Sequence, residues 1–295
     1  MLAHLNATPV KPSRAVVIGA SGFVGGAVAA RLETAGVPVL RIGSKEVDLL
    51  AADAAERLGA LLREGDAVVA VSAIAPCKTP AMLRDNAVLS LALVSALAAA
   101  PVSHVVNISS DAVFADGPRP LTEETPKAPD SLHGAMHLSR EIMFRSAVTA
   151  PLAILRPTLV YGAADPHNGY GPNQFRRKAN RGENIVLFGE GEERRDHVLV
   201  DDIAEIVLRV LLRRSTGDLN VVTGEVASFK EVAEAVTALS PVKVAVSGSP
   251  RKGPMPHDGY RPFDIAACRA AFPDFHYTPL AEGLARVQKA EFGHG

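Results

Sequence analysis

Three glycines near the start of the sequence have the spacing of a turn that binds phosphate. Gly19, Gly22 and Gly25 lie in the stretch GASGFVG, after a β-branched run and before an Ala-rich stretch. In such a turn the first glycine allows the sharp bend, the second lets backbone N–H groups approach a pyrophosphate, and the third allows close packing of helix on strand. An ordinary glycine turn has the same letters, but a place between strand and helix favours a dinucleotide site. The candidate contacts are Gly19, Ser21, Gly22, Phe23, Val24 and Gly25.

The second β-branched run carries a basic residue near its end. An NAD site often has an acid there to hold the ribose diol, whereas VPVLRIGSKEVD has none before Glu46. Arg41, with Ser44 and Lys45 behind it, could instead meet a 2′-phosphate. An isolated basic pair is more commonly solvated. After the glycine motif, however, this pair predicts NADP as the cofactor, with NAD as the second choice.

Short β-branched runs alternate with longer Ala- and Leu-rich stretches in the first half of the chain. Runs that are nearly continuous in apolar residues are typical of parallel strands covered on both faces, and the stretches between them suit right-handed crossovers. We predict strands at 15–19, 37–42, 67–72, 104–109 and 152–157, and helices at 23–35, 52–63, 82–100 and 132–148. This order predicts an α/β protein with a doubly wound parallel sheet, the Rossmann fold.

The sequence changes character after Tyr161, where a Gly-, Pro- and Asn-rich stretch begins. Further on we predict helices at 175–181 and 202–213, strands at 185–188 and 220–222, and a loop at 250–263. We therefore expect a tail at 1–13, a dinucleotide-binding domain at 14–160, and a smaller mixed α/β substrate-binding domain over most of 161–295. Some segments of this last part could return to the Rossmann sheet.

Composition excludes several classes of protein. Hydrophobic residues make up 47% of the 295 residues and charged residues 21%, unlike a disordered or collagen-like chain. Lys plus Arg is 31 against 32 for Asp plus Glu, so no basic field attracts nucleic acid or lipid. Cys77 and Cys268 are too few for a disulfide framework. Without a signal peptide or an apolar run of roughly 20 residues, we expect a cytoplasmic protein that binds neither nucleic acid nor membrane.

Several segments, in the right order and at the right separations, resemble the extended short-chain dehydrogenase/reductase family. These are the NAD-dependent epimerase/dehydratase proteins, and the nucleotide-sugar reductases are nearest. Beyond GASGFVG, the segments that carry the resemblance are RIGSKEVDLL, SAIAP, SSDAVFADG, LRPTLVYG and NIVLFGEGEERRDHVLVDDIAEIV.

The resemblance implies roles for particular residues. Ser110 would contact a substrate hydroxyl with Asp111 beside it, Thr158 would lie near the nicotinamide and the substrate, and Arg195 would bind the substrate diphosphate. The implied cofactor contacts are Arg41, Asp48, Leu49, Ser72, Ala73, Ile74, Asn86 and Pro157.

The family's catalytic Tyr and Lys are absent from the matching helix. The segment SLHGAMHLSRE fits the pattern YGxxKxxxE at Gly134 and Glu141, but His133 and His137 stand in place of Tyr and Lys. In the family the tyrosine exchanges a proton with the substrate oxygen, while the lysine binds ribose and lowers the tyrosine pKa. None of the four tyrosines of this chain lies on the helix.

A pair of imidazoles could perform the same chemistry. Four-residue spacing places both on one helical face. With an ordinary pKa near 6.5, neutral His133 is a competent base at pH 7, which predicts an inflection of the rate near pH 6 to 7. Two neighbouring imidazoles also disfavour each other's protonation. We therefore expect an NADP-dependent enzyme that reduces or epimerises a nucleotide-sugar-like substrate. The sequence leaves the oligomeric state open, although relatives commonly form dimers through the helices at 82–100 and 132–148.

Two alternatives remain open for the histidine pair. One is a protein that has lost the redox step and binds the dinucleotide as a regulatory or scaffolding subunit. The other is a metal held by His133 and His137, for which no third ligand is evident, so we expect no metal.

Structural interpretations also exist for the other candidates. Ser110 and Asp111 could cap a turn. Arg195 could pair with Asp196 or Asp201 in a solvated charge run. The histidines that we interpret as structural, with satisfied hydrogen bonds, include His104, His167 and His197.

Overall fold

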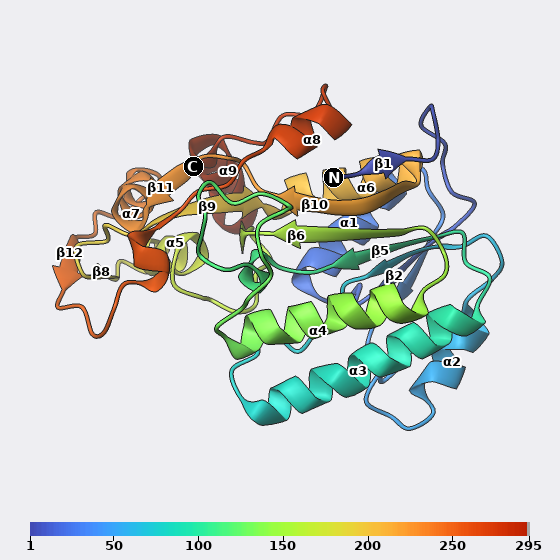
Figure 1. Cartoon of the computed structure of the whole chain (residues 1–295). Coiled ribbons are helices and arrows are strands. Elements are labelled where there is room, and N and C mark those ends of the chain that lie inside the picture. The colour runs from blue at the N-terminus through green and yellow to red at the C-terminus, as the bar shows by residue number, and fades with distance from the viewer. Residues whose placement is uncertain (294–295) are drawn as a thin grey trace.

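A seven-stranded sheet forms the centre of the computed structural model, which describes residues 1–293 (Figure 1). Its strand order is β1-β10-β6-β5-β4-β2-β3, and every neighbouring pair is parallel except β1 with β10. The strands are β1 (Ala3–His4), β2 (Ala15–Ile18), β3 (Val39–Ile42), β4 (Ala67–Ala70), β5 (His104–Ile108), β6 (Leu152–Pro157) and β10 (Ser215–Val221). The predicted doubly wound parallel sheet is confirmed.

Helices cover both faces of this sheet. On one face lie α2 (Ala54–Leu61), α3 (Pro80–Ala99) and α4 (Leu132–Ala147), and on the other α1 (Phe23–Thr34) and α6 (Val200–Arg213) (Figure 1). Strands β2, β4 and β5 are buried along their whole length, which explains their continuous apolar sequences. The strand order reverses between β2 and β4, which is where ligands bind in open α/β sheets.

The helix α3 is long and apolar enough to cross a membrane, judged by length and composition alone, with a mean hydropathy of 1.4 in its best window. The core helices of soluble proteins pass the same test. Here α3 packs between α2 and α4, with Leu89, Leu93 and Leu97 buried in the core on this side of the sheet.

The remaining elements form a smaller group around a separate core. Strand β9 (Arg194–Leu199) pairs with β7 (Leu159–Tyr161), β11 (Val226–Ser228) and β13 (Tyr260–Arg261), and β8 (Ile185–Phe188) pairs with β12 (Val246–Ser249). The helices of this part are α5 (Pro172–Asn180), α7 (Phe229–Ala238) and α9 (Leu280–Phe292). Helix α8 (Ala266–Ala271) instead packs against β10, with Ala267 and Cys268 in the core of the main sheet.

Two segments differ from the sequence expectation. The predicted loop at 250–263 contains a 3₁₀ turn, η2 (Pro256–Gly259), and strand β13. Residues expected to form a tail include β1, which extends the main sheet beside β10. Since β10 itself lies after residue 161 and pairs with β6, the later part of the chain contributes to the main sheet. The domain boundary near residue 160 stays a prediction.

Candidate functional site

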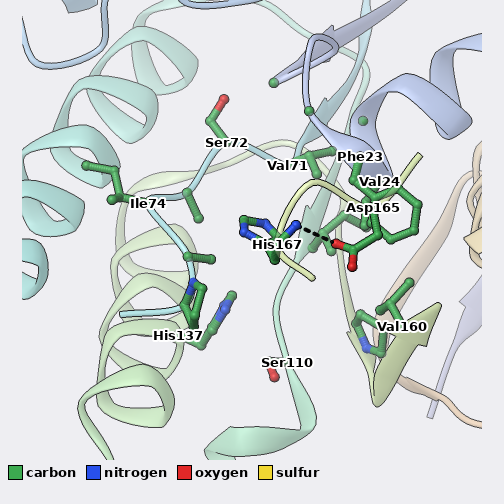
Figure 2. A pocket seen from close by; sticks show the side chains of 18 of the residues that line it. Phe23, Val24, Val71, Ser72, Ile74, Ser110, His137, Val160, Asp165 and His167 are labelled. Atoms are coloured by element: carbon green, nitrogen blue, oxygen red, sulfur yellow. Dashed lines mark hydrogen bonds between the residues drawn. The ribbon is translucent and has the colours of Figure 1, made fainter. Parts of the chain in front are cut away.

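One cavity of about 750 Å³ lies at the carboxyl ends of the central strands (Figure 2). It extends from the glycine turn past α4 to β9 of the smaller part. Nearly all residues singled out in the sequence line it. They are Gly19, Ser21, Gly22, Phe23, Val24, Gly25, Ser44, Asp48, Leu49, Ser72, Ala73, Ile74, Ser110, Asp111, His133, His137, Pro157, Thr158 and Arg195.

The glycine turn has the shape of a phosphate cradle. Gly19 has φ +96°, and a Cβ there would lie 2.7 Å from the backbone N of Ser72. A Cβ at Gly25 would lie 2.1 Å from the carbonyl oxygen of Gly19. Helix α1 begins after Gly22 with no side-chain cap and no acid in its first turn, so its first N–H groups are available to an anion.

Two predicted cofactor contacts lie outside the cavity lining. The Arg41 guanidinium donates to both carboxylate oxygens of Glu33, at 2.8 and 2.7 Å, and both side chains are exposed. This hydrogen bond lowers the pKa of Glu33. Asn86 accepts from the backbone N of Ile74 at 2.9 Å and donates to its carbonyl oxygen at 3.0 Å. It therefore supports a cavity wall from behind.

The imidazoles of His133 and His137 meet edge to face, with ring centroids 4.7 Å apart. The backbone N–H of Cys77 donates to Nδ1 of His133 at 3.4 Å. A donor at Nδ1 makes that nitrogen the acceptor, so neutral His133 carries its proton on Nε2. His133 can thus donate a proton from Nε2, one direction of the proton exchange that the sequence interpretation assigned to it.

Burial keeps both imidazoles neutral. It lowers the pKa of His133, while the nearby Asp111 acts in the opposite direction. Burial also lowers the pKa of His137 to well below its usual value, and the neighbouring His133 and Arg140 lower it further. The inflection expected near pH 6 to 7 therefore moves to lower pH.

Ser110 and Asp111 both line the cavity and form a turn. The Ser110 hydroxyl accepts from the backbone N of Ala112 at 3.2 Å, which caps the 3₁₀ turn η1 (Asp111–Val113). Arg261 of β13 donates to the Asp111 carboxylate at 3.1 Å and to its carbonyl oxygen at 2.8 Å. The turn is therefore stabilised by the Ser110 cap at its start and by Arg261 from β13.

Helix α4 sits tightly against this turn. A Cβ at Gly134 would lie 2.1 Å from the carbonyl oxygen of Ala112. One turn below His137, Glu141 accepts two bonds of 2.7 Å from the buried Arg156 and one of 2.6 Å from Ser109. The two residues that matched the family pattern, Gly134 and Glu141, thus set the position of α4.

The far end of the cavity contains polar groups that sequence reasoning partly missed. Arg195 pairs with Glu193 at 3.1 Å rather than with Asp196 or Asp201, and it lies on β9 instead of in a solvated loop. Its buried Nε has no hydrogen-bond partner within residues 1–293.

His197 also lies on β9 and lines the cavity, two residues after Arg195 and on the same face of the strand. Within the described part of the chain neither ring nitrogen has a hydrogen-bond partner, so its interpretation as a satisfied structural residue is wrong. Burial lowers its pKa to about 3. The alternation of β9 was the signal that could have identified it.

His167 projects into the same space from the loop before α5 (Figure 2). Its backbone N–H donates to Asp165 at 3.1 Å. No group of three or more His, Cys, Asp or Glu residues in the described chain is arranged to hold a metal ion.

Comparisons with known proteins agree with this geometry. The model of the NAD dependent epimerase/dehydratase family matches residues 15–222. A UDP-glucose 4-epimerase from Mycolicibacterium smegmatis is 28% identical over 254 residues, which cover 76% of this chain and 81% of that protein. A dTDP-4-dehydro-6-deoxy-D-allose reductase from Streptomyces bikiniensis is 30% identical over 145 residues, 46% of this chain and 42% of that protein.

Solved structures show the same fold. A GDP-L-fucose synthetase from Naegleria fowleri bound to NADP superimposes with a TM-score of 0.83 at 18% identity, covering 97% of this chain and 96% of that chain. A putative epimerase from Burkholderia cenocepacia gives a TM-score of 0.82 at 24% identity, covering 97% of this chain and 100% of that chain.

Proposed function

This chain belongs to the NAD dependent epimerase/dehydratase family, and we propose that it is an NADP-dependent enzyme that reduces or epimerises a nucleotide-activated sugar. NAD is the second choice of cofactor. One observation carries the proposal: a single cavity joins the phosphate cradle at Gly19–Gly25 to the imidazole pair and to Arg195. This cavity would bring a dinucleotide, a proton-transfer group and a substrate phosphate into one space.

The residues present fit a nicotinamide dinucleotide. The cradle excludes side chains at Gly19 and Gly25, and the N–H groups at the start of α1 can hold the diphosphate. Ser44 and Asp48 would hold the adenosine end. Arg41 would meet a 2′-phosphate after leaving Glu33, which is feasible because an exposed ion pair contributes little. When bound, the nicotinamide supplies or accepts hydride.

His133 would transfer the proton. In the reductive direction its Nε2–H would give its proton to the substrate oxygen as that oxygen becomes an alcohol, and solvent would return a proton to the imidazolate that remains. In the reverse direction this imidazolate, and not the ring protonated at Nε2, would accept the proton. The Ser110 hydroxyl would orient that oxygen. The Cys77 N–H, bonded to Nδ1, stabilises the charge that develops on the ring as the proton leaves.

The substrate would occupy the far end of the cavity. The Arg195 guanidinium can bind a diphosphate. His197, which is neutral and has no hydrogen-bond partner among residues 1–293, can both donate to and accept from a sugar or nucleoside group. Thr158 lines the space between them and the reacting end.

We also propose that the enzyme is a cytoplasmic homodimer. Leu91 and Val88 of α3 and Ile142 of α4 are exposed apolar side chains on two helices that lie side by side (Figure 1). A second copy would cover them. Both cysteines are free and buried, which suits a reducing compartment.

The proposal is tested by cofactor titration followed by a substrate panel. We expect NADPH to bind more tightly than NADH. Protein, cofactor and UDP-, dTDP- or GDP-sugars are then incubated together, and the absorbance of the reduced nicotinamide and the product masses are followed. Failure to bind either dinucleotide would overturn the proposal.

Binding without turnover on any sugar would instead support the regulatory alternative. The double variant His133→Tyr with His137→Lys separates the two readings. If only this variant turns over substrate, the natural site has lost its chemistry. We expect activity in the natural protein and a large loss in His133→Gln.

A further inference from the structure

Arg140 on α4 is a buried arginine that has no acidic partner in the described part of the chain. It is 1% exposed, and its Nε donates to Oδ1 of Asn107 at 2.7 Å. Its two terminal nitrogens donate to the carbonyl oxygens of Ala70, at 3.1 Å, and Ser72. No carboxylate within residues 1–293 forms an ion pair with it.

The other fully buried arginines differ in this respect. Arg156 pairs with Glu141 and Asp218, Arg176 pairs with Glu291, and Arg261 pairs with Asp111 and Asp116. Neutral oxygens satisfy the N–H groups of Arg140, and its guanidinium carbon lies 5.2 Å from the centre of the Phe144 ring, but no carboxylate among residues 1–293 neutralises its charge. A buried cation of this kind is costly for folding alone.

The guanidinium nevertheless keeps its proton. Burial lowers the pKa of Arg140 to about 10, which is still well above neutral pH. A full positive charge therefore lies within the protein beside the candidate site, unshielded by solvent.

The three oxygens that bind Arg140 lie in or just after strands that carry the site. Ala70 ends β4, and Ser72 in the next turn lines the cavity together with Ile74. Asn107 lies in β5, three residues before Ser110. Arg140 itself lies three residues after His137, on the same face of α4. Figure 2 shows Ser72, Ile74 and His137 around the same cavity.

We propose that Arg140 is a positioning residue for the reaction at His133: it fastens the imidazole-bearing helix to the strand end beneath the cofactor and places a fixed positive charge behind the imidazole pair. That charge disfavours an imidazolium and stabilises negative charge on the substrate oxygen during reduction. The part of this proposal that concerns turnover rests on the proposed function, whereas the effect on the imidazoles does not.

Few other charges act on the pair. Asp111 of η1 is near His133 and is itself paired with Arg261, and the thiol of Cys77 is buried nearby. On α3, Arg84 and Asp85 pair with each other at the surface. Besides the neighbouring His133, Arg140 is therefore the one cation that lowers the pKa of His137 among the described residues.

The test titrates the imidazoles by NMR in the full chain without cofactor. His133→Gln and His137→Gln assign the two signals. In Arg140→Met we expect the titration of His137 to move to higher pH, while Arg140→Lys, which keeps the charge, stays close to the natural protein. Arg84→Met, which removes an exposed charge, serves as the control and should change nothing. An unmoved His137 titration in a folded Arg140→Met would overturn the proposal.

A second variant keeps the test valid if Arg140→Met does not fold. Asn107→Asp puts a carboxylate against Nε of Arg140 and neutralises its charge while leaving the arginine in place. We expect it to shift His137 in the same direction as Arg140→Met. No shift in folded Asn107→Asp would contradict the proposal.

Turnover gives the second readout. We expect kcat to fall roughly tenfold in Arg140→Met, less than the loss of a direct oxyanion donor, with substrate KM little changed. Arg140→Lys should recover most of this loss. A fall in Arg140→Lys as large as in Arg140→Met would show a packing role instead. If the natural protein binds no dinucleotide, the proposed function fails while the titration result stands.

Discussion

The contact between α4 and η1 predicts a large effect of one added methyl group. In Gly134→Ala the new Cβ would lie 2.1 Å from the Ala112 carbonyl oxygen, whereas ordinary contacts begin at 3.4 Å. The helix must therefore move by about 1.3 Å, the difference between these two distances. Since η1 begins directly after Ser110, the movement separates Ser110 from His133. A misplacement of about 1 Å costs roughly 100-fold in rate, and overpacking costs about 1–3 kcal/mol of stability.

The assay compares Gly134→Ala with Gly59→Ala. Gly59 lies inside α2, where an added Cβ meets nothing within 4 Å, so this control should gain up to about 1 kcal/mol of stability from helix propensity and keep its activity. We expect kcat/KM of Gly134→Ala to fall roughly 100-fold with cofactor affinity nearly unchanged, because the phosphate cradle lies on another element. A Gly134→Ala enzyme with the natural kcat/KM would refute the reasoning.

Three further predictions follow from buried or paired charges. Because burial lowers the pKa of His133, activity that needs the neutral ring should persist as the pH falls through 6.5 and should be lost only at lower pH. An inflection of the pH–rate profile at or above pH 6.5 would count against this site. Glu33→Gln frees Arg41 and should lower the dissociation constant of NADP by up to about fivefold while leaving that of NAD unchanged. If the ratio of the two dissociation constants does not change, Arg41 does not belong to the cofactor site. Glu141→Gln breaks a buried bidentate pair with Arg156 and should lower the free energy of unfolding by about 3 kcal/mol, measured by denaturant titration. A variant with nearly the natural stability would contradict this expectation.

The sequence predicted the features that depend on local pattern. Strands β2, β4 and β5 are continuous apolar runs because helices cover both faces of the sheet. The glycine turn could be predicted because a side chain at Gly19 or Gly25 would clash with the backbone. The position of the imidazole pair followed from Gly134 and Glu141. These features need only neighbours along the chain or a known pattern.

Features that depend on distant partners could not be predicted. Arg41 lies near the end of β3, but its partner Glu33 comes from α1. The run around Arg194 reads as a solvated loop, whereas Arg194 bonds to Glu231 and Arg195 to Glu193, which allows the charged run to form β9. No periodicity in the sequence shows which arginine will be buried without an acid.

The bond between Arg261 and Asp111 limits how this fold can be recombined. The arginine comes from the last part of the chain and reaches the turn that carries Ser110 in the first part. A chimera that takes residues after 160 from a relative must supply a guanidinium at this position, or a buried carboxylate loses its counter-ion. An exchange of substrate-binding parts between such proteins is therefore constrained by Asp111, which lies in the part of the chain that is not exchanged.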